Sequence, residues 1–252
     1  MPASLQVVEV AEGVRSLTIS HPEQKNALDA DFLDALEHVL LQERGVRAWL
    51  VRAEGSVFSA GYDLTALNGF AEDRALPEVR MGEVFDRLAS HPAPSVALVT
   101  GPAVGAGCEL AAACDFRVGN GLARFSMPPA KLGVVYALKG LQRLASRVGE
   151  QAARRMFLTA RPVGAEEAAR LGLLDVLSQS AEAEAVRLCT ELAALAPLAV
   201  GGMKRGFELL GDASATDLEN YERMRRVSFN SEDAREGKKA LLARRPPKFR
   251  GF

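Results

Sequence analysis

The sequence has no long apolar run and no excess of charge of either sign. No stretch reaches the roughly 18 consecutive apolar residues of a membrane helix, and the opening MPASLQVVEV lacks the basic and strongly apolar parts of a secretory signal. We therefore expect a soluble, cytoplasmic protein with no membrane partner. Lysine and arginine number 31 against 32 aspartate and glutamate, so we expect no nucleic-acid partner either.

Cysteine and histidine are scarce as well. Cys108, Cys114 and Cys189 are odd in number and unpaired in spacing, so we interpret them as small buried side chains in a reducing compartment. Only three histidines occur and two of them precede proline, which argues against a zinc site or a Ser-His-Asp triad; we predict no metal. The P-loop and the G-x-S-x-G motif are missing, which excludes a phosphate-binding P-loop and a nucleophilic serine in that motif.

The first half of the chain contains strand-like and helix-like segments in alternation. With 48% hydrophobic residues, the protein can bury a large core. Residues 14–20 and 46–54 have the composition of strands, and Asp29 can cap a helix that begins after it. Apolar residues return at helical spacing over 81–88 and stop at the sequence HPAP. This alternation predicts an α/β core.

The second half is different, because from about residue 140 onward the patterns are helical. Three stretches place apolar residues on one face of a helix: 149–158, 180–195 and 214–229. We predict an α/β core domain over residues 1–195 and a helical region over residues 196–252.

Two segments combine a strand with small residues at the start of a helix, namely FSAGYDL (58–64) and GPAVGAGCELAAACDFRV (101–118). The first backbone N–H groups of a helix have no partner within it and lie at the positive end of its dipole. Such groups bind a phosphate or stabilise an oxyanion, and glycine lets a ligand approach them closely. Two of them facing one point would polarise a carbonyl group, but the sequence leaves open whether these two segments converge.

These segments resemble the two oxyanion-hole segments of the crotonase superfamily, the enoyl-CoA hydratase/isomerase family. The typical forms are F-x-A-G-x-D-L and G-x-x-x-G-x-G-x-E-L-x-x-x-C-D. Further segments follow in family order over nearly the whole chain: HPEQKNAL, FSMPPAKLG, ALKGLQRL, ARPVGAEEAARLGLLDVL and RRPPKF. The resemblance implies an α/β fold, a crotonase-like ββα spiral with a C-terminal helical trimerisation region. It also implies a homo-trimer or hexamer and an acyl-CoA thioester substrate, whose coenzyme A makes a separate cofactor unnecessary.

The resemblance also implies roles for individual residues. The backbone N–H groups of Tyr62 and Ala106 match the two donors of the oxyanion hole around the thioester carbonyl. Phe249 matches a C-terminal aromatic residue that covers the adenine of coenzyme A bound to a neighbouring subunit. Five other residues match positions that line the nucleotide and pantetheine parts of coenzyme A: Lys25, Ala27, Ala60, Asp63 and Leu64.

Glu109 matches the first of two glutamates with which hydratases of the family hold and activate water. A helix start favours the charged carboxylate and apolar neighbours favour the neutral acid, so the direction of its pKa shift stays open. In FSMPPAKLG, Pro129 stands where hydratases have the second glutamate, and proline neither takes nor gives a proton. Hydration by two glutamates, and isomerisation by the second glutamate alone, are therefore disfavoured.

Tyr136 suggests a different acid–base group, because it matches a tyrosine of the methylmalonyl-CoA decarboxylase-like branch. That branch has a histidine where this sequence has Tyr62. We favour a hydratase-like lyase that uses Glu109 and a second group other than glutamate. The alternatives are a decarboxylase or other enolate-forming enzyme that uses Tyr136, a catalytically silent acyl-CoA-binding protein, and an unrelated nucleotide-dependent oxidoreductase. The dinucleotide motif for the last is weak, since its third glycine falls on Leu110.

Overall fold

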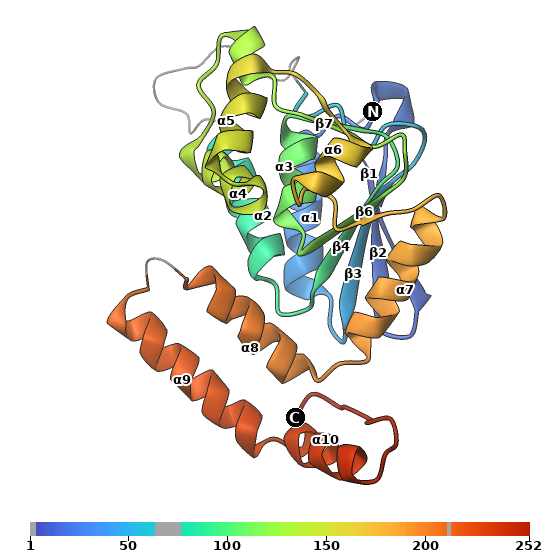
Figure 1. The fold of residues 1–252 in the computed structure, drawn as a ribbon, viewed down its shortest axis with the longest axis vertical. Coiled ribbons are helices and arrows are strands. Elements are labelled where there is room, and N and C mark those ends of the chain that lie inside the picture. The colour runs from blue at the N-terminus through green and yellow to red at the C-terminus, as the bar shows by residue number, and fades with distance from the viewer. Residues whose placement is uncertain (1–3, 64–76, 211–212) are drawn as a thin grey trace.

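The computed structural model describes residues 4–63, 77–210 and 213–252. Its centre is a six-stranded sheet with the strand order β1-β2-β3-β4-β6-β9 (Figure 1). β1 and β2 are antiparallel, and all the other neighbouring pairs in this sheet are parallel. The strands are β1 (Ser4–Ala11), β2 (Val14–Ser20), β3 (Ala48–Ala53), β4 (Ser95–Val99), β6 (Phe116–Gly119) and β9 (Val176–Leu177).

Helices cover both faces of this sheet. On one face lie α1 (Ala30–Gln42), α2 (Pro77–Ser90), α3 (Ala106–Ala113), α4 (Leu138–Val148) and α5 (Glu150–Thr159), whereas α7 (Ala181–Ala193) covers the other (Figure 1). Successive side chains of a strand point to opposite faces. In β3, Trp49 and Val51 accordingly pack in the core beneath α1 and α2, while Ala48 and Leu50 pack beneath α7. In β4, whose two faces are both covered, all five residues are buried and the last four form an unbroken apolar run.

A second, smaller sheet joins β5 (Pro102–Val104), β7 (Arg124–Ser126) and β8 (Val163–Gly164), and α6 (Ala165–Arg170) follows it. The sequence prediction of helices alone after residue 140 is incomplete here, because β8 and β9 interrupt them. Each of these strands has two residues, which is too short for any alternation of polar and apolar positions to show. The predicted strand 14–20 and the cap at Asp29, which accepts a hydrogen bond from Phe32 N at 2.8 Å, are confirmed.

The last three helices, α8 (Pro197–Glu208), α9 (Ala215–Asn230) and α10 (Glu232–Leu242), extend away from the sheet (Figure 1). Both α8 and α9 are described throughout, and neither contains a buried residue. Large apolar side chains are exposed on them, including Phe207 and Phe229. The predicted helix at 214–229 is therefore confirmed, but its apolar face is not covered by this chain. The predicted domain boundary falls between α7 and α8 and stays a prediction.

Among the described residues, no single helix is long and apolar enough to cross a membrane. α7 and α8 reach the required length and composition only when taken together, and they meet at a bend of 106°. The three cysteines are free and buried, as expected from the sequence.

Candidate active site

The two glycine-containing segments lie side by side, which the sequence alone could not show. Ser59 and Ala103 form a parallel β-bridge, and Val104 N donates a hydrogen bond to Ser59 O at 2.9 Å. Gly61 approaches the second segment so closely that a Cβ atom there would lie 2.7 Å from Val104 O and 3.5 Å from Ala106 N. Its φ of +98° also requires glycine. Gly61 therefore permits the contact between the segments of Tyr62 and Ala106.

The backbone directions in both segments suit a pair of hydrogen-bond donors. Leu28 N donates to Gly61 O and Asp63 N donates to Leu28 O, each at 2.8 Å. Because backbone groups alternate in direction along an extended segment, the N–H of Tyr62 points away from Leu28. Ala106 is the first residue of α3, so its N–H has no acceptor within the helix. Such a pair, at the positive end of a helix, is suited to stabilising negative charge on oxygen.

Glu109 lies one turn into α3, and its side chain is only 2% exposed. Both of its carboxylate oxygens are engaged. The hydroxyl of Tyr136 donates to Oε2 at 2.6 Å, and Nη1 of Arg143 in α4 donates to Oε1. Arg143 also pairs with Asp86 of α2, which in turn binds Lys139 of α4. The result is a chain of alternating charges, Lys139–Asp86–Arg143–Glu109, that we call the α2–α4 ion-pair chain.

Burial decides the direction of the pKa shift of Glu109, which the sequence left open. Loss of solvent around the carboxylate raises its pKa above the ordinary glutamate value, and this effect outweighs the opposing influence of Arg143 and Tyr136. The pKa of Tyr136 is raised well above its ordinary value, chiefly by burial and also by the neighbouring Glu109. The site thus combines a carboxylate of raised basicity with a phenol that is protonated at neutral pH.

A glycine in α4 makes this arrangement possible. A Cβ atom on Gly140 would lie 2.4 Å from Cε1 of Tyr136 and 3.0 Å from Oε2 of Glu109. The ring of Tyr136 is held from another side by Phe157, with ring centroids 5.5 Å apart. Pro129 begins a short 3-10 helix (Pro129–Leu132) and is buried, so the position matching the second glutamate is occupied by an apolar ring.

Most of the residues predicted to bind coenzyme A lie together. Lys25 O accepts a hydrogen bond from Ala60 N at 2.9 Å, and Leu28 pairs with Tyr62 in a parallel bridge. The segment that carries Lys25 and Ala27 therefore runs beside the one that carries Ala60 and Asp63. Leu64, the remaining predicted position, lies outside the described residues.

Phe249 does not join this group within one chain. Its carbonyl accepts a hydrogen bond from Nη1 of Arg47 at 3.4 Å, and its ring lies beside Gly237 of α10. Arg47 precedes β3, whereas the segment 58–63 follows the opposite end of that strand. The prediction that Phe249 serves a neighbouring subunit stays a prediction.

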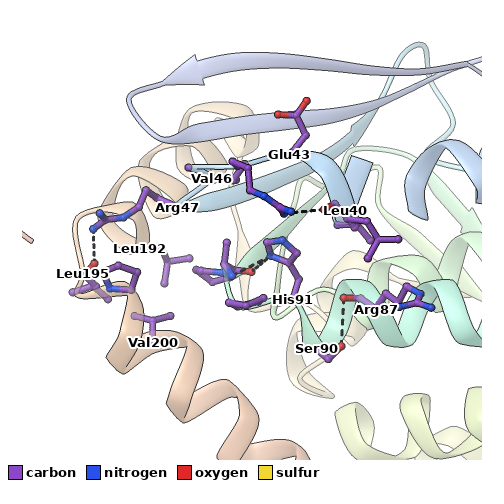
Figure 2. Close-up of a pocket in the computed structure, with 17 residues that line it drawn as sticks. Leu40, Glu43, Val46, Arg47, Arg87, Ser90, His91, Leu192, Leu195 and Val200 are labelled. Carbon is purple, nitrogen blue, oxygen red and sulfur yellow. Dashed lines mark hydrogen bonds between the residues drawn. The ribbon is translucent and has the colours of Figure 1, made fainter. Parts of the chain in front are cut away.

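A separate cavity of about 570 Å³ lies near Arg47, between the end of α1 and the segment before β4 (Figure 2). It contains none of the predicted site residues. His91, on its wall, accepts hydrogen bonds at Nδ1 from Trp49 Nε1 at 3.2 Å and from Ala93 N at 3.1 Å. Burial lowers the pKa of His91, so its role here is that of a neutral hydrogen-bond acceptor. Over the described ranges, no group of three or more His, Cys, Asp or Glu residues could hold a metal ion.

Sequence reasoning missed Arg143, Asp86 and Lys139. The four-residue spacing of Lys139 and Arg143 is the one signal that could have found part of this group, because residues four apart share a helix face. Asp86 gave no such signal, since it lies 57 residues from Arg143 in the chain.

The fold and this site define a crotonase-type protein. The sequence pattern described as Enoyl-CoA hydratase/isomerase matches residues 9–251. The chain is 34% identical over 245 residues to a "Probable enoyl-CoA hydratase" of Mycobacterium bovis, covering 96% of this chain and 97% of the relative. It is 30% identical over 247 residues to the methylmalonyl-CoA decarboxylase of Escherichia coli, covering 94% and 95%.

A solved structure of an enoyl-CoA hydratase from Bacillus anthracis superposes with a TM-score of 0.90 at 25% identity, over 98% of this chain and 99% of that one. The protein therefore belongs to the enoyl-CoA hydratase/isomerase family. The family match extends through α8, α9 and α10, so the helical region belongs to the same family unit as the core.

Proposed function

We propose that this protein is an enoyl-CoA hydratase-like lyase that stabilises a thioester enolate between the N–H groups of Tyr62 and Ala106. The observation that carries the proposal is the hydrogen bond from the partly buried Tyr136 to the buried Glu109, which lies one helical turn from the N–H of Ala106. A thioester carbonyl held by two N–H donors acquires negative charge as the enolate forms. A base and an acid next to that position can then complete the addition of water.

The proton balance follows from the hydrogen bond between Glu109 and Tyr136. Glu109 takes a proton from water while the water oxygen bonds to the β-carbon and the carbon–carbon double bond becomes an enolate. Tyr136 gives its hydroxyl proton to the α-carbon, and the oxyanion collapses back to the thioester carbonyl. The proton on Glu109 then passes to the Tyr136 oxygen across their 2.6 Å hydrogen bond, which restores both groups. Tyr136 thereby replaces the second glutamate, whose position holds Pro129.

Decarboxylation is the second candidate, supported by Tyr136 and by the relative from Escherichia coli. A substrate carboxylate beside Tyr136 would meet the negative charge of Glu109, however. Arg143, the cation that contacts Glu109, is also engaged by Asp86. Like charges at close range disfavour each other, so the charge arrangement favours a neutral enoyl group.

Binding and assembly complete the proposal. We propose that coenzyme A lies along the paired segments of Lys25 to Ala27 and Ala60 to Asp63 and onward to Leu64, and that Phe249 covers the adenine bound to a neighbouring subunit. We propose a homo-trimer or hexamer in solution. The exposed apolar side chains of α8 and α9 support this, since a single chain leaves them in water.

Mass spectrometry of a panel of thioesters tests the reaction. Enoyl-CoA, malonyl-type and glutaconyl-type thioesters are incubated with the protein, and a gain of water is distinguished from a loss of carbon dioxide. We expect a gain of water. Glu109→Gln should lower kcat about 100- to 10,000-fold, and Tyr136→Phe about 100-fold, because general acid–base groups contribute in this range. Glu167→Gln, on the surface and paired with Arg155, is the matched control.

Two other results would contradict hydration, and a third would contradict the role of Glu109. Loss of carbon dioxide, with Tyr136→Phe the more damaging substitution, would indicate the decarboxylase. Coenzyme A binding without turnover of any thioester would indicate a silent binding protein. Near-wild-type hydration by Glu109→Gln would remove Glu109 from the mechanism.

A further inference from the structure

We propose that Arg143 is a positioning residue that fixes the orientation and the charge state of Glu109 through the α2–α4 ion-pair chain. This inference rests on the proposed function only where it calls Glu109 the base; the ion pairs themselves do not depend on the reaction. It assigns a role to α2 and α4, neither of which carries the donors for the thioester carbonyl.

The geometry of Arg143 shows how orientation is fixed. One guanidinium nitrogen, Nη1, donates to Oε1 of Glu109, and the other, Nη2, donates to Oδ1 of Asp86. The side chain of Arg143 is 9% exposed, so this planar group is held by its two carboxylates rather than by water. Arg143 and Tyr136 together hold both oxygens of Glu109 and thereby set the plane of its carboxylate. Each carboxylate oxygen still has a second acceptor position, to which a water can bind.

The charges around Glu109 oppose one another in a defined way. Those that act on it directly are Arg143 of α4, Asp86 of α2, and the neutral Tyr136 and Cys108, whereas Lys139 of α4 pairs with Asp86. Arg143 favours the ionised form of Glu109, whereas Asp86 and burial favour the neutral form. Removal of Arg143 takes away the cation that pairs with the buried carboxylate of Glu109. Removal of the Asp86 charge takes away a nearby negative charge, so that Arg143 pairs with Glu109 and no longer with Asp86. The two removals should therefore shift the titration of Glu109 in opposite directions.

Arg147 offers a matched control on the same helix. It lies one turn after Arg143 and also connects α4 to α3, with Nε donating to Ala112 O at 3.0 Å and Nη2 donating to Cys114 O at 3.1 Å. These acceptors are backbone carbonyls at the far end of α3, not Glu109. A purely structural role for the α4 arginines would make Arg143→Gln and Arg147→Gln behave alike.

The test combines two pH titrations. The pH dependence of kcat/KM is measured on a thioester that the protein converts. Independently, the side-chain carboxyl carbons of ¹³C-labelled glutamates are titrated by NMR without substrate, with Glu109→Gln to assign the resonance. Arg143→Gln should move both midpoints up by about one to three pH units, since a close opposite charge shifts a carboxyl pKa by this amount. Turnover at neutral pH should fall about 10- to 1000-fold and recover in alkali.

Two more variants keep the test decisive. Arg143→Lys retains the positive charge but lacks the planar guanidinium that contacts two carboxylates at once. Its titration midpoints should therefore lie close to those of the unmodified protein, while its turnover should recover less completely. Asp86→Asn should move both midpoints down. An unchanged NMR titration in Asp86→Asn or in folded Arg143→Gln, or an equal shift in Arg147→Gln, would overturn the inference. If no thioester is converted while the NMR midpoints shift in opposite directions, the proposed reaction fails and the positioning role stands.

Discussion

Side chains on α3 are buried, whereas large apolar side chains on α8 and α9 are exposed to solvent. All eight residues of α3 are buried, and its one carboxylate has partners on both oxygens from within the same chain. On α8 and α9, by contrast, Phe207 and Phe229 are 74% and 76% exposed. Both regions fall within one family match. The carboxylate of Glu109 thus finds its partners within one chain, whereas one chain leaves the apolar faces of α8 and α9 uncovered.

The strongest prediction tests whether the site depends on the backbone donors beside α3. Ala106→Pro removes one N–H, and the first position of a helix tolerates proline. We expect turnover to fall about 100- to 1000-fold, because one oxyanion donor contributes this much. Ala106→Gly, which keeps the N–H, is the control, and circular dichroism checks the fold. Wild-type turnover by a folded Ala106→Pro protein would contradict the two-donor site.

The next prediction addresses the helical region. Its expected effect is smaller, a mass in solution three or six times that of one chain. We expect light scattering to show a trimer or hexamer of the 27.0 kDa chain. Replacing Phe207 and Phe229 by aspartate should give smaller species, because charge on these faces opposes their burial. Leu122→Asp is the control, since Leu122 is 67% exposed but lies outside the helical region, just before β7. A stable monomer of the unmodified protein at micromolar concentration would show that the helical faces stay in water.

Features that depend on nearby residues were predictable from the sequence, and those that depend on packing were not. The strand 14–20, the cap at Asp29 and the placement of Glu109 in a helix follow from local patterns. The contact of Gly61 with the segment before α3 joins residues about 45 positions apart, and the pairing of Asp86 with Arg143 joins residues 57 apart. No local pattern encodes either.

The same reasoning explains the pKa of Glu109. Its direction depends on how completely α2, α4 and the ring of Tyr136 exclude water, which only the packed structure shows. The sequence showed that Pro129 replaces a glutamate, but it could not show that Tyr136 donates directly to Glu109. The absence of the second glutamate was thus a sequence finding, and the hydrogen bond between Tyr136 and Glu109 is a structural one.

The smallest expected effect concerns the link between the two regions. Nζ of Lys204, in α8, lies 2.6 Å from Oδ2 of Asp115, the residue just before β6. Lys204 and Asp115 are both partly buried, so Lys204→Gln should weaken this attachment by about 1 kcal/mol. Hydrogen exchange should become several-fold faster in the amides of α8 and stay unchanged in α3. Because Glu109 holds its partners within the core, kcat should change less than about twofold. A large loss of kcat in Lys204→Gln would show that the site is not independent of the helical region.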